Sequence, residues 1–162
     1  MTVTPSQLEQ KARTLLTERG VCVNDIAELI LFLQQAYIPD LTLEMCALSV
    51  DAVLGKREVQ NAILTGIQLD LLAEQKQLMD PLQEIVEKDE GLYGIDEILA
   101  FSIVNVYGSI GFTNYGYIDK VKPGILAKLN DHTAPHVHTF LDDIIGAIAA
   151  AAASRIAHQH PF

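Results

Sequence analysis

Three short acidic segments lie in the apolar C-terminal half of this 162-residue chain, and their residue types suit a metal site. Carboxylates are costly to bury unless they are paired or bound to a cation. Clusters that offer only oxygen atoms suit Mg²⁺ or Mn²⁺ better than zinc, and a neighbouring lysine suits an anionic substrate such as a phosphate. The polar residues of the three segments are Asp96 and Glu97, Asp119 and Lys122, and Asp142 and Asp143.

Each acidic segment also has an ordinary structural interpretation. The pairs at 96–97 and 142–143 open predicted helices, where the helix dipole favours acids. Asp119 and Lys122 are three residues apart, so on a helix they share a face and could form a surface ion pair. Residue types and spacing alone leave both hypotheses open: acids that cap helices, or acids that gather at a metal site.

Several other chemistries find no support in the sequence. The chain contains no D-x-D-x-T segment, no cysteine followed by five residues and an arginine, and neither G-x-x-x-x-G-K-[ST] nor G-x-G-x-x-G. Its formal net charge of −10 argues against a nucleic-acid partner, which favours a basic surface. The same charge fits either a solvated acidic surface or carboxylates gathered to hold divalent cations.

The elements that would position these residues are predicted to be helices. Helical periodicity dominates the sequence, and the alternation typical of strands is nearly absent. Thr4-Pro5, Asn24 and Thr42 are typical of helix starts, and residues 56–78 have the pattern of a long helix. No internal repeat or linker is visible, so the sequence predicts one all-α domain over residues 1–162, a single-domain helical bundle.

The segment Tyr93–Gly108 is apolar on almost every side, which is typical of a helix at the buried centre of a bundle. The longest uninterrupted apolar run, 144–153, is far shorter than the roughly 18–20 residues that cross a membrane. No basic and then apolar N-terminal pattern of a secretory signal is visible. We therefore expect Tyr93–Gly108 to form the central helix of the bundle. We also expect the protein to be cytoplasmic.

The cysteines and the loop histidines are predicted to have no catalytic role. Cys22 and Cys46 fall singly inside helical patterns and are expected to be buried free thiols. His132, His136 and His138 lie in a polar segment before the last helix. Their spacing would permit a transition-metal site, but we expect solvated side chains of an exposed loop.

The order of the acidic motifs resembles that of a known enzyme family. The motifs are "IDE" at 95–97, "YIDKVKPGI" at 117–125 and "FLDDIIGAIAA" at 140–150. They resemble the apolar-D-E, F-D-x-x-K-P and D-D-x-x-A-G motifs of the phosphatidylglycerophosphatase A family, in particular its soluble branch without membrane-spanning helices. The chain departs from the family's pattern in four places. "HVHTF" stands where the family has a glycine-rich approach to the aspartate pair, and Gly146-Ala147 stands where the family has A-G. K-P-x-P is reduced to Lys122-Pro123-Gly124, and the family's N-terminal P-G-T segment has no clean counterpart.

The resemblance implies an all-α fold with one central helix ringed by others, and a Mg²⁺-dependent lipid phosphatase that converts phosphatidylglycerophosphate to phosphatidylglycerol. Carried over by position, it implies the catalytic residues Asp96, Glu97, Asp119, Lys122, Asp142 and Asp143. The metal ligands expected among them are Asp96, Asp119, Asp142 and Asp143. Lys122 would offset the charge of the phosphate, and one carboxylate would act as a base.

The expected partner is an anionic phospholipid or another phosphomonoester, reached by peripheral contact at the inner face of the membrane. Two alternatives stay open at this point. The substrate could be a soluble phosphomonoester, or the protein could be a non-catalytic helical module for interaction or oligomerisation whose acids only cap helices. The alanine-rich last helix could pack within or between subunits, so a homo-oligomer is a further expectation.

Overall fold

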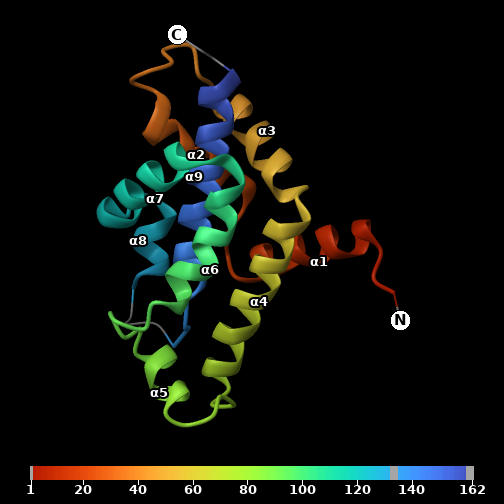
Figure 1. The fold of residues 1–162 in the computed structure, drawn as a ribbon, viewed down its shortest axis with the longest axis vertical. Coiled ribbons are helices and arrows are strands. Elements are labelled where there is room, and N and C mark those ends of the chain that lie inside the picture. The colour runs from red at the N-terminus through yellow and green to blue at the C-terminus, as the bar shows by residue number, and fades with distance from the viewer. Residues whose placement is uncertain (1, 132–134, 160–162) are drawn as a thin grey trace.

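Helix α9 (Leu141–Gln159) occupies the middle of the molecule, and the other helices surround it (Figure 1). The structure is a computed structural model that describes residues 2–131 and 135–159. In that part of the chain there are helices and no strand, which confirms the predicted all-α class. The other helices are α1 (Pro5–Glu18), α2 (Val23–Gln34), α3 (Leu43–Leu54), α4 (Arg57–Glu74), α5 (Leu82–Glu87), α6 (Ile95–Val104), α7 (Ser109–Val121) and α8 (Ile125–Leu129).

Small side chains let α9 be enclosed on all sides. All of its residues from Ile144 to Ala153 are buried, and six of them are alanines. Helices α2, α3, α4, α6, α7 and α8 all pack against it. An alanine-rich helix is thin, so backbones can approach it closely from every direction. Among the described residues, no helix is long and apolar enough to cross a membrane.

The predicted position of Tyr93–Gly108 at the centre of the bundle is wrong. This segment forms α6 and a short 3₁₀ turn at Asn105–Tyr107, and it covers one side of α9. Ala100, Ile103 and Val104 are buried against the core, whereas Ile95 and Ile98 are exposed. Hydrophobicity alone does not decide which of two apolar helices is enclosed, and here the helix with the smaller side chains is the enclosed one.

Local capping signals mark the starts of α1 and α3 as expected, but the predicted cap at Asn24 is wrong, because α2 begins at Val23 and Cys22 holds its N-cap position. The Thr4 hydroxyl accepts from the Gln7 N–H, and Pro5 is the first residue of α1. The Thr42 hydroxyl accepts from the Met45 N–H at the start of α3. At α2 the Asp25 carboxylate accepts from the Cys22 N–H, 2.9 Å away.

The expectation for the cysteines holds at one position. Cys46 is buried on α3, where burial raises the pKa of its thiol to about 11. Cys22 lies just outside α2 and is exposed, so its predicted burial is wrong. Its place at the edge of the helix pattern, where no packed face covers it, explains the difference.

The histidine segment before α9 is only partly exposed. His136 is exposed as expected, and His132 lies outside the described residues. Val137 is buried and His138 is half-buried, so an exposed loop is the wrong description for these two residues. The backbone there is held by the ion-paired side chains of Arg19, directly after α1, and Glu74 on α4.

Candidate metal and phosphate site

The acidic motifs of α7 and α9 meet inside the bundle. Asp119 lies in the last turn of α7, and Asp142 and Asp143 lie in the first turn of α9. One carboxylate oxygen from each of the three residues lies within 4.8 Å of the others. Both α9 residues are buried and Asp119 is half-buried. These acids therefore face one another, and do not cap helices on separate solvent faces.

Lys122 is placed beside these acids by the end of α7. It adopts a left-handed conformation with a φ of 48°, which ends the helix immediately before Pro123. Its Nζ lies 2.8 Å from Asp119 Oδ1 and 3.5 Å from Asp142 Oδ2. Burial lowers the pKa of this amine, but the hydrogen bond to Asp119 and the charge of Asp142 outweigh that effect and raise it. Lys122 is therefore a cation held among the carboxylates.

The motif at the start of α6 contributes one of its two acids to the interior. Asp96 is buried, and its Oδ1 accepts from the Glu97 N–H at 3.0 Å. A hydrogen bond with Asp96 is one cause of the raised pKa of Asp143, so the two carboxyl groups are in contact. Glu97 itself is exposed. The structure thus brings Asp96 to the other acids and leaves Glu97 at the surface beside them.

The acids of α9 lie in surroundings that disfavour their charged forms. Burial, the charge of Asp142 and the hydrogen bond with Asp96 raise the pKa of Asp143 to about 10. Burial also raises the pKa of Asp142 to about 7, an effect that Lys122 reduces and the charge of Asp89 increases. Four acids, Asp96, Asp119, Asp142 and Asp143, thus crowd around one lysine, and in the absence of a cation the two acids of α9 are driven toward their neutral forms. A divalent cation would instead favour their charged forms.

Three residues near the cluster were not predicted from the sequence. The Tyr115 hydroxyl donates to Asp143 Oδ1 at 3.0 Å, and Tyr115 is one helical turn before Asp119, so the spacing on α7 could have indicated it. Asp70 lies on the apolar stripe of α4, seven residues after the buried Ile63, and an acid in that position is a usable signal. Asp89 follows α5, and nothing in its local sequence points to the site.

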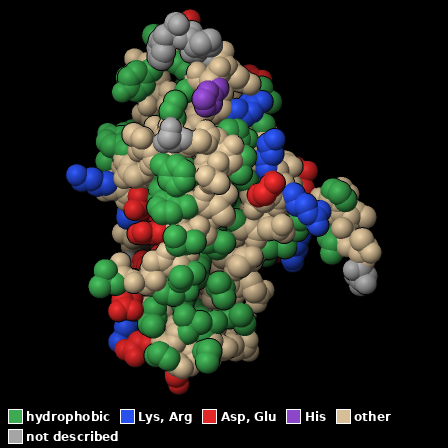
Figure 2. All heavy atoms as spheres, in the orientation of Figure 1, with side chains coloured by type: hydrophobic (Ala, Val, Ile, Leu, Met, Phe, Trp, Pro, Cys, Tyr) green, Lys and Arg blue, Asp and Glu red, His purple; other side chains and the backbone are tan. Residues whose placement is uncertain are grey.

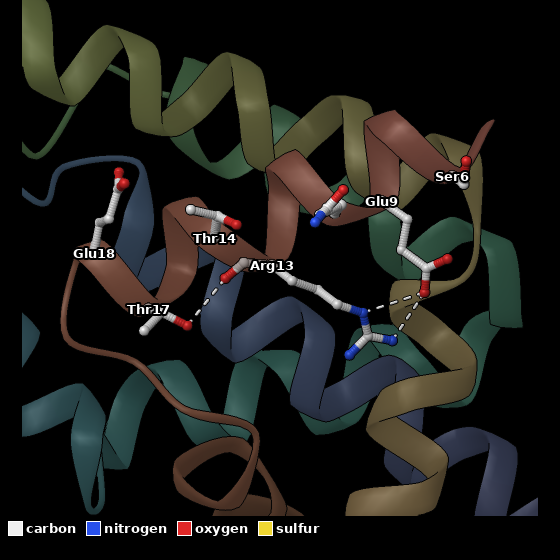
Figure 3. Close-up of a pocket in the computed structure, with 7 residues that line it drawn as sticks. Ser6, Glu9, Arg13, Thr14, Thr17 and Glu18 are labelled. Atoms are coloured by element: carbon white, nitrogen blue, oxygen red, sulfur yellow. Dashed lines mark hydrogen bonds and ion pairs between the residues drawn. The ribbon is translucent and has the colours of Figure 1, made fainter. Parts of the chain in front are cut away.

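A hollow elsewhere on the surface has a different character. It has a volume of about 560 Å³ and lies along α1, where Figure 3 shows Ser6, Glu9, Arg13, Thr14, Thr17 and Glu18 around it. The guanidinium of Arg13 donates to Glu9 Oε1 within the hollow and to Asp51 Oδ1 on α3. The pair with Asp51 ties α1 to α3, and none of the acidic motif residues lines the hollow.

Comparisons with known proteins agree with the motifs. The family model for phosphatidylglycerophosphatase A matches residues 18–158. The uncharacterized protein YutG of Bacillus subtilis (strain 168) is 69% identical over 154 residues, which cover 95% of this chain and 93% of that protein. The crystal structure of the low temperature requirement C protein from Listeria monocytogenes is 71% identical, with a TM-score of 0.94 and coverage of 96% of this chain and 98% of that one.

A second solved relative is more distant in sequence and equally close in fold. The crystal structure of protein ypjQ from Bacillus subtilis is 55% identical, with a TM-score of 0.93 and coverage of 97% of both chains. The family match spans all three acidic motifs and nearly all of the described helices. The chain therefore belongs to the phosphatidylglycerophosphatase A family.

Proposed function

We propose that this protein is a Mg²⁺-dependent phosphatase that removes the terminal phosphate of phosphatidylglycerophosphate. The observation that carries the proposal is the meeting of the Asp119, Asp142 and Asp143 carboxylates within 4.8 Å, beside the Lys122 amine. Membership of the phosphatidylglycerophosphatase A family supports the reaction and the substrate. The alternative in which the acids only cap helices does not account for carboxylates from two helices facing one another.

The donor set fits Mg²⁺ on chemical grounds. Asp119, Asp142 and Asp143 offer only carboxylate oxygens, which are the ligands that hard divalent cations prefer. Asp96 is in contact with Asp143 and would complete the set. The raised pKa values of Asp142 and Asp143 reflect burial and mutual repulsion that a bound cation would relieve. When bound, Mg²⁺ would supply positive charge to phosphate oxygens and orient them for attack by water.

The residues of the chain itself have distinct tasks in this proposal. Lys122, protonated between two acids, would offset negative charge on the phosphate as it is transferred. Tyr115 fixes the orientation of Asp143 through its hydroxyl. Glu97 is exposed at the edge of the cluster, so its carboxylate could take a proton from water and release it to solvent. The buried acids would bind and orient the cation.

The start of α9 leaves no backbone amide for the phosphate. The N–H groups of Phe140 and Leu141 donate to a carboxylate from α4, and those of Asp142 and Ile144 donate to backbone carbonyls. The Asp143 N–H donates to the side chain of Asp142 at 2.8 Å. A free helix N-terminus is a common anion site, but here its donors are used. Phosphate recognition would therefore depend on the cation and Lys122.

An apolar surface beside the acids supports a lipid substrate. Leu92 is 93% exposed, and Ile95 and Ile98 on α6 are also exposed. Over residues 91–118 the charged side chains are only Asp96 and Glu97. Figure 2 shows hydrophobic side chains spread over α6 and toward α5, with acidic side chains along the margin near α8. We propose that acyl chains contact this surface while the phosphate reaches the acids.

A phosphate-release assay tests the catalytic proposal. The purified protein should hydrolyse phosphatidylglycerophosphate in vesicles with Mg²⁺ and lose that activity in EDTA. Asp142→Asn should lower kcat/KM on the order of 100-fold or more, because it removes charge from the cluster. Asp40→Asn is the matched control, since Asp40 is an exposed acid outside the site. Full activity in EDTA would contradict the proposal.

A substrate panel tests the lipid part separately. The panel compares the lipid in vesicles with glycerol phosphate at equal Mg²⁺ concentration. Ile98→Asp should raise KM for the vesicle substrate several-fold and leave hydrolysis of any soluble phosphate unchanged. Leu48→Asp, at an exposed leucine on α3, should have no effect on either. Equal rates on both substrates, with no effect of Ile98→Asp, would favour a soluble phosphomonoester.

A further inference from the structure

The start of α9 is capped by a side chain from another helix. Asp70 on α4 is 0% exposed, and its two carboxylate oxygens each accept one hydrogen bond from α9. The Phe140 N–H donates to Oδ1 and the Leu141 N–H donates to Oδ2, both at 3.0 Å. Phe140 has no polar side-chain atom, and the Thr139 hydroxyl donates to the Val86 carbonyl. Asp70 therefore takes the role that a local N-cap residue usually has.

The neighbouring turns of α4 hold the same segment of chain. One turn before Asp70, Gly66 faces α9: a Cβ atom there would lie 2.2 Å from Ile144 Cδ1, so the close approach of the helices requires glycine. One turn after Asp70, Glu74 Oε1 accepts from the Val137 N–H at 2.8 Å. The guanidinium of Arg19 pairs with Glu74 at 2.6 Å and donates to the Val137 carbonyl at 2.8 Å.

These contacts end directly before the acids of the candidate site. The segment held by α4 runs from residue 137 to residue 141, and Asp142 and Asp143 are the next two residues. The sequence at 136–140 is "HVHTF", and the segment contains no glycine. Its backbone direction is set by the side chains of Asp70 and Glu74. A small shift of this segment would move both aspartates relative to Asp119.

We propose that Asp70 is a positioning residue for the cation site, an inference that rests on the proposed function. Both of its oxygens are engaged by α9 amides, so it acts through the placement of Asp142 and Asp143 and does not contact the cation. Its two carboxyl oxygens lie at the positive end of the α9 dipole, where hydrogen-bond acceptors are favoured. Residues that orient metal ligands commonly change metal affinity 10- to 100-fold when they are replaced.

Mn²⁺ binding to the intact protein tests this role without an activity assay. Asp70→Asn keeps the shape but presents an amide NH₂ to one of the two N–H donors, so one of the two hydrogen bonds is lost. We expect the Kd for Mn²⁺, measured by titration calorimetry or by the EPR signal of free Mn²⁺, to rise about 10-fold or more. Circular dichroism and urea unfolding would establish that the variant is folded.

The matched control is Ser49→Ala. Like Asp70, Ser49 is buried and forms a hydrogen bond with the backbone of α9: its hydroxyl donates to the Ala152 carbonyl at 2.9 Å. This contact lies ten residues along α9 from Asp142, far from the acids. This variant should lose stability and keep the wild-type Kd for Mn²⁺ within about twofold. Equal affinity in folded Asp70→Asn and wild type, or an equal loss in Ser49→Ala, would overturn the positioning role.

A measurement on the wild-type protein covers the case in which Asp70→Asn does not fold. Because linkage is reciprocal, a cation that fixes Asp142 and Asp143 should slow hydrogen exchange at the amides that donate to Asp70, those of Phe140 and Leu141. Mg²⁺ that leaves their exchange unchanged while it binds would overturn the inference. A wild-type protein that binds neither Mn²⁺ nor Mg²⁺ would overturn the proposed function as well, so the two failures are distinct.

Discussion

The Tyr115 hydroxyl donates a 3.0 Å hydrogen bond to Asp143 Oδ1, and this contact joins α7 to α9 at the acidic cluster. Tyr115 is buried, and this burial, together with the surrounding acids, holds the pKa of its phenol well above the ordinary value. The hydroxyl is therefore a fixed donor at any physiological pH. The hydrogen bond fixes the position of Asp143 Oδ1, so Oδ2 of the same carboxyl group is left for its other contacts in the cluster.

Tyr115→Phe is expected to cost more stability with Mg²⁺ than without it. Burial and the charge of Asp142 raise the pKa of Asp143 in the metal-free protein and favour its neutral form, and a hydrogen bond to a neutral group contributes about 1 kcal/mol. Bound Mg²⁺ would hold Asp143 ionised, and hydrogen bonds to charged groups contribute about 1.5–3 kcal/mol. Urea unfolding of both proteins with EDTA and with Mg²⁺ measures the two losses. Equal losses would show that the cation does not ionise Asp143.

Mg²⁺ itself is expected to raise the melting temperature of the wild-type protein in a saturable manner. A ligand that binds only the folded state stabilises it by about 2.7 kcal/mol at 100 times its Kd. Asp142→Asn should remove this response. Without metal that variant should be at least as stable as wild type, because a buried charge is gone from a repulsive cluster. A melting temperature that does not change with Mg²⁺, or a response to Mg²⁺ in Asp142→Asn equal to that of wild type, would contradict a cation site at Asp142.

The sequence indicated the acids that lie together in the fold but not the helix at its centre, and the role of these acids as a metal site stays a prediction. Asp96, Asp119 and Asp142 could be found because each is an acid in an apolar segment, and the order of their motifs is specific. Their mutual contact depends on how α6, α7 and α9 pack, which periodicity does not describe. Helix α9 is central because its side chains are small on every face. The sequence prediction gave more weight to hydrophobicity, which is higher in residues 93–108, and therefore placed that segment at the centre.

Residues that act through tertiary contacts were harder to predict. Asp70 lies 70 residues before the amide that donates to its Oδ1, so no local pattern connects the two. An acid on the buried stripe of α4 indicates that hydrogen-bond donors must lie near its carboxyl group, but the sequence does not identify those donors. Asp89 has no such signal, because it sits in the polar segment after α5. In both cases the deciding information is the fold itself.

Gly66→Ala is expected to separate α4 from α9. The new Cβ would overlap with Ile144 Cδ1 at 2.2 Å and press on Phe140 Cβ at 3.1 Å, inside a fully packed core. Overpacking of this kind typically costs 1–3 kcal/mol. Gly116→Ala on α7 is the matched control, because nothing lies within 4 Å of its Cβ position, and alanine there should stabilise by about 0.5–1 kcal/mol. Urea unfolding measures both. A Gly66→Ala protein as stable as wild type would contradict the close approach.

His138 is expected to make stability depend on pH between about 6.5 and 4. Burial and the charge of Arg19, whose guanidinium lies 3.1 Å from His138 Nδ1, lower the pKa of the imidazole to about 4. Above pH 6.5 neither the folded nor the unfolded chain holds this proton. Below it the unfolded chain takes up a proton that the folded protein does not, so stability falls as the pH falls through this window. Partial exposure limits the loss to about 1–2 kcal/mol.

His138→Asn isolates this contribution, because its side-chain oxygen can replace Nδ1 as the acceptor for Arg19 and does not titrate. The free energy of unfolding of this variant, measured in urea at pH 7.5 and pH 5, should fall less over that interval than that of wild type. His158→Asn serves as the control: His158 is exposed in the last turn of α9, so its replacement should leave the wild-type dependence largely in place. Parallel pH profiles for wild type and His138→Asn would mean that the imidazole is solvated and that the segment before α9 is not held by Arg19 as the structure has it.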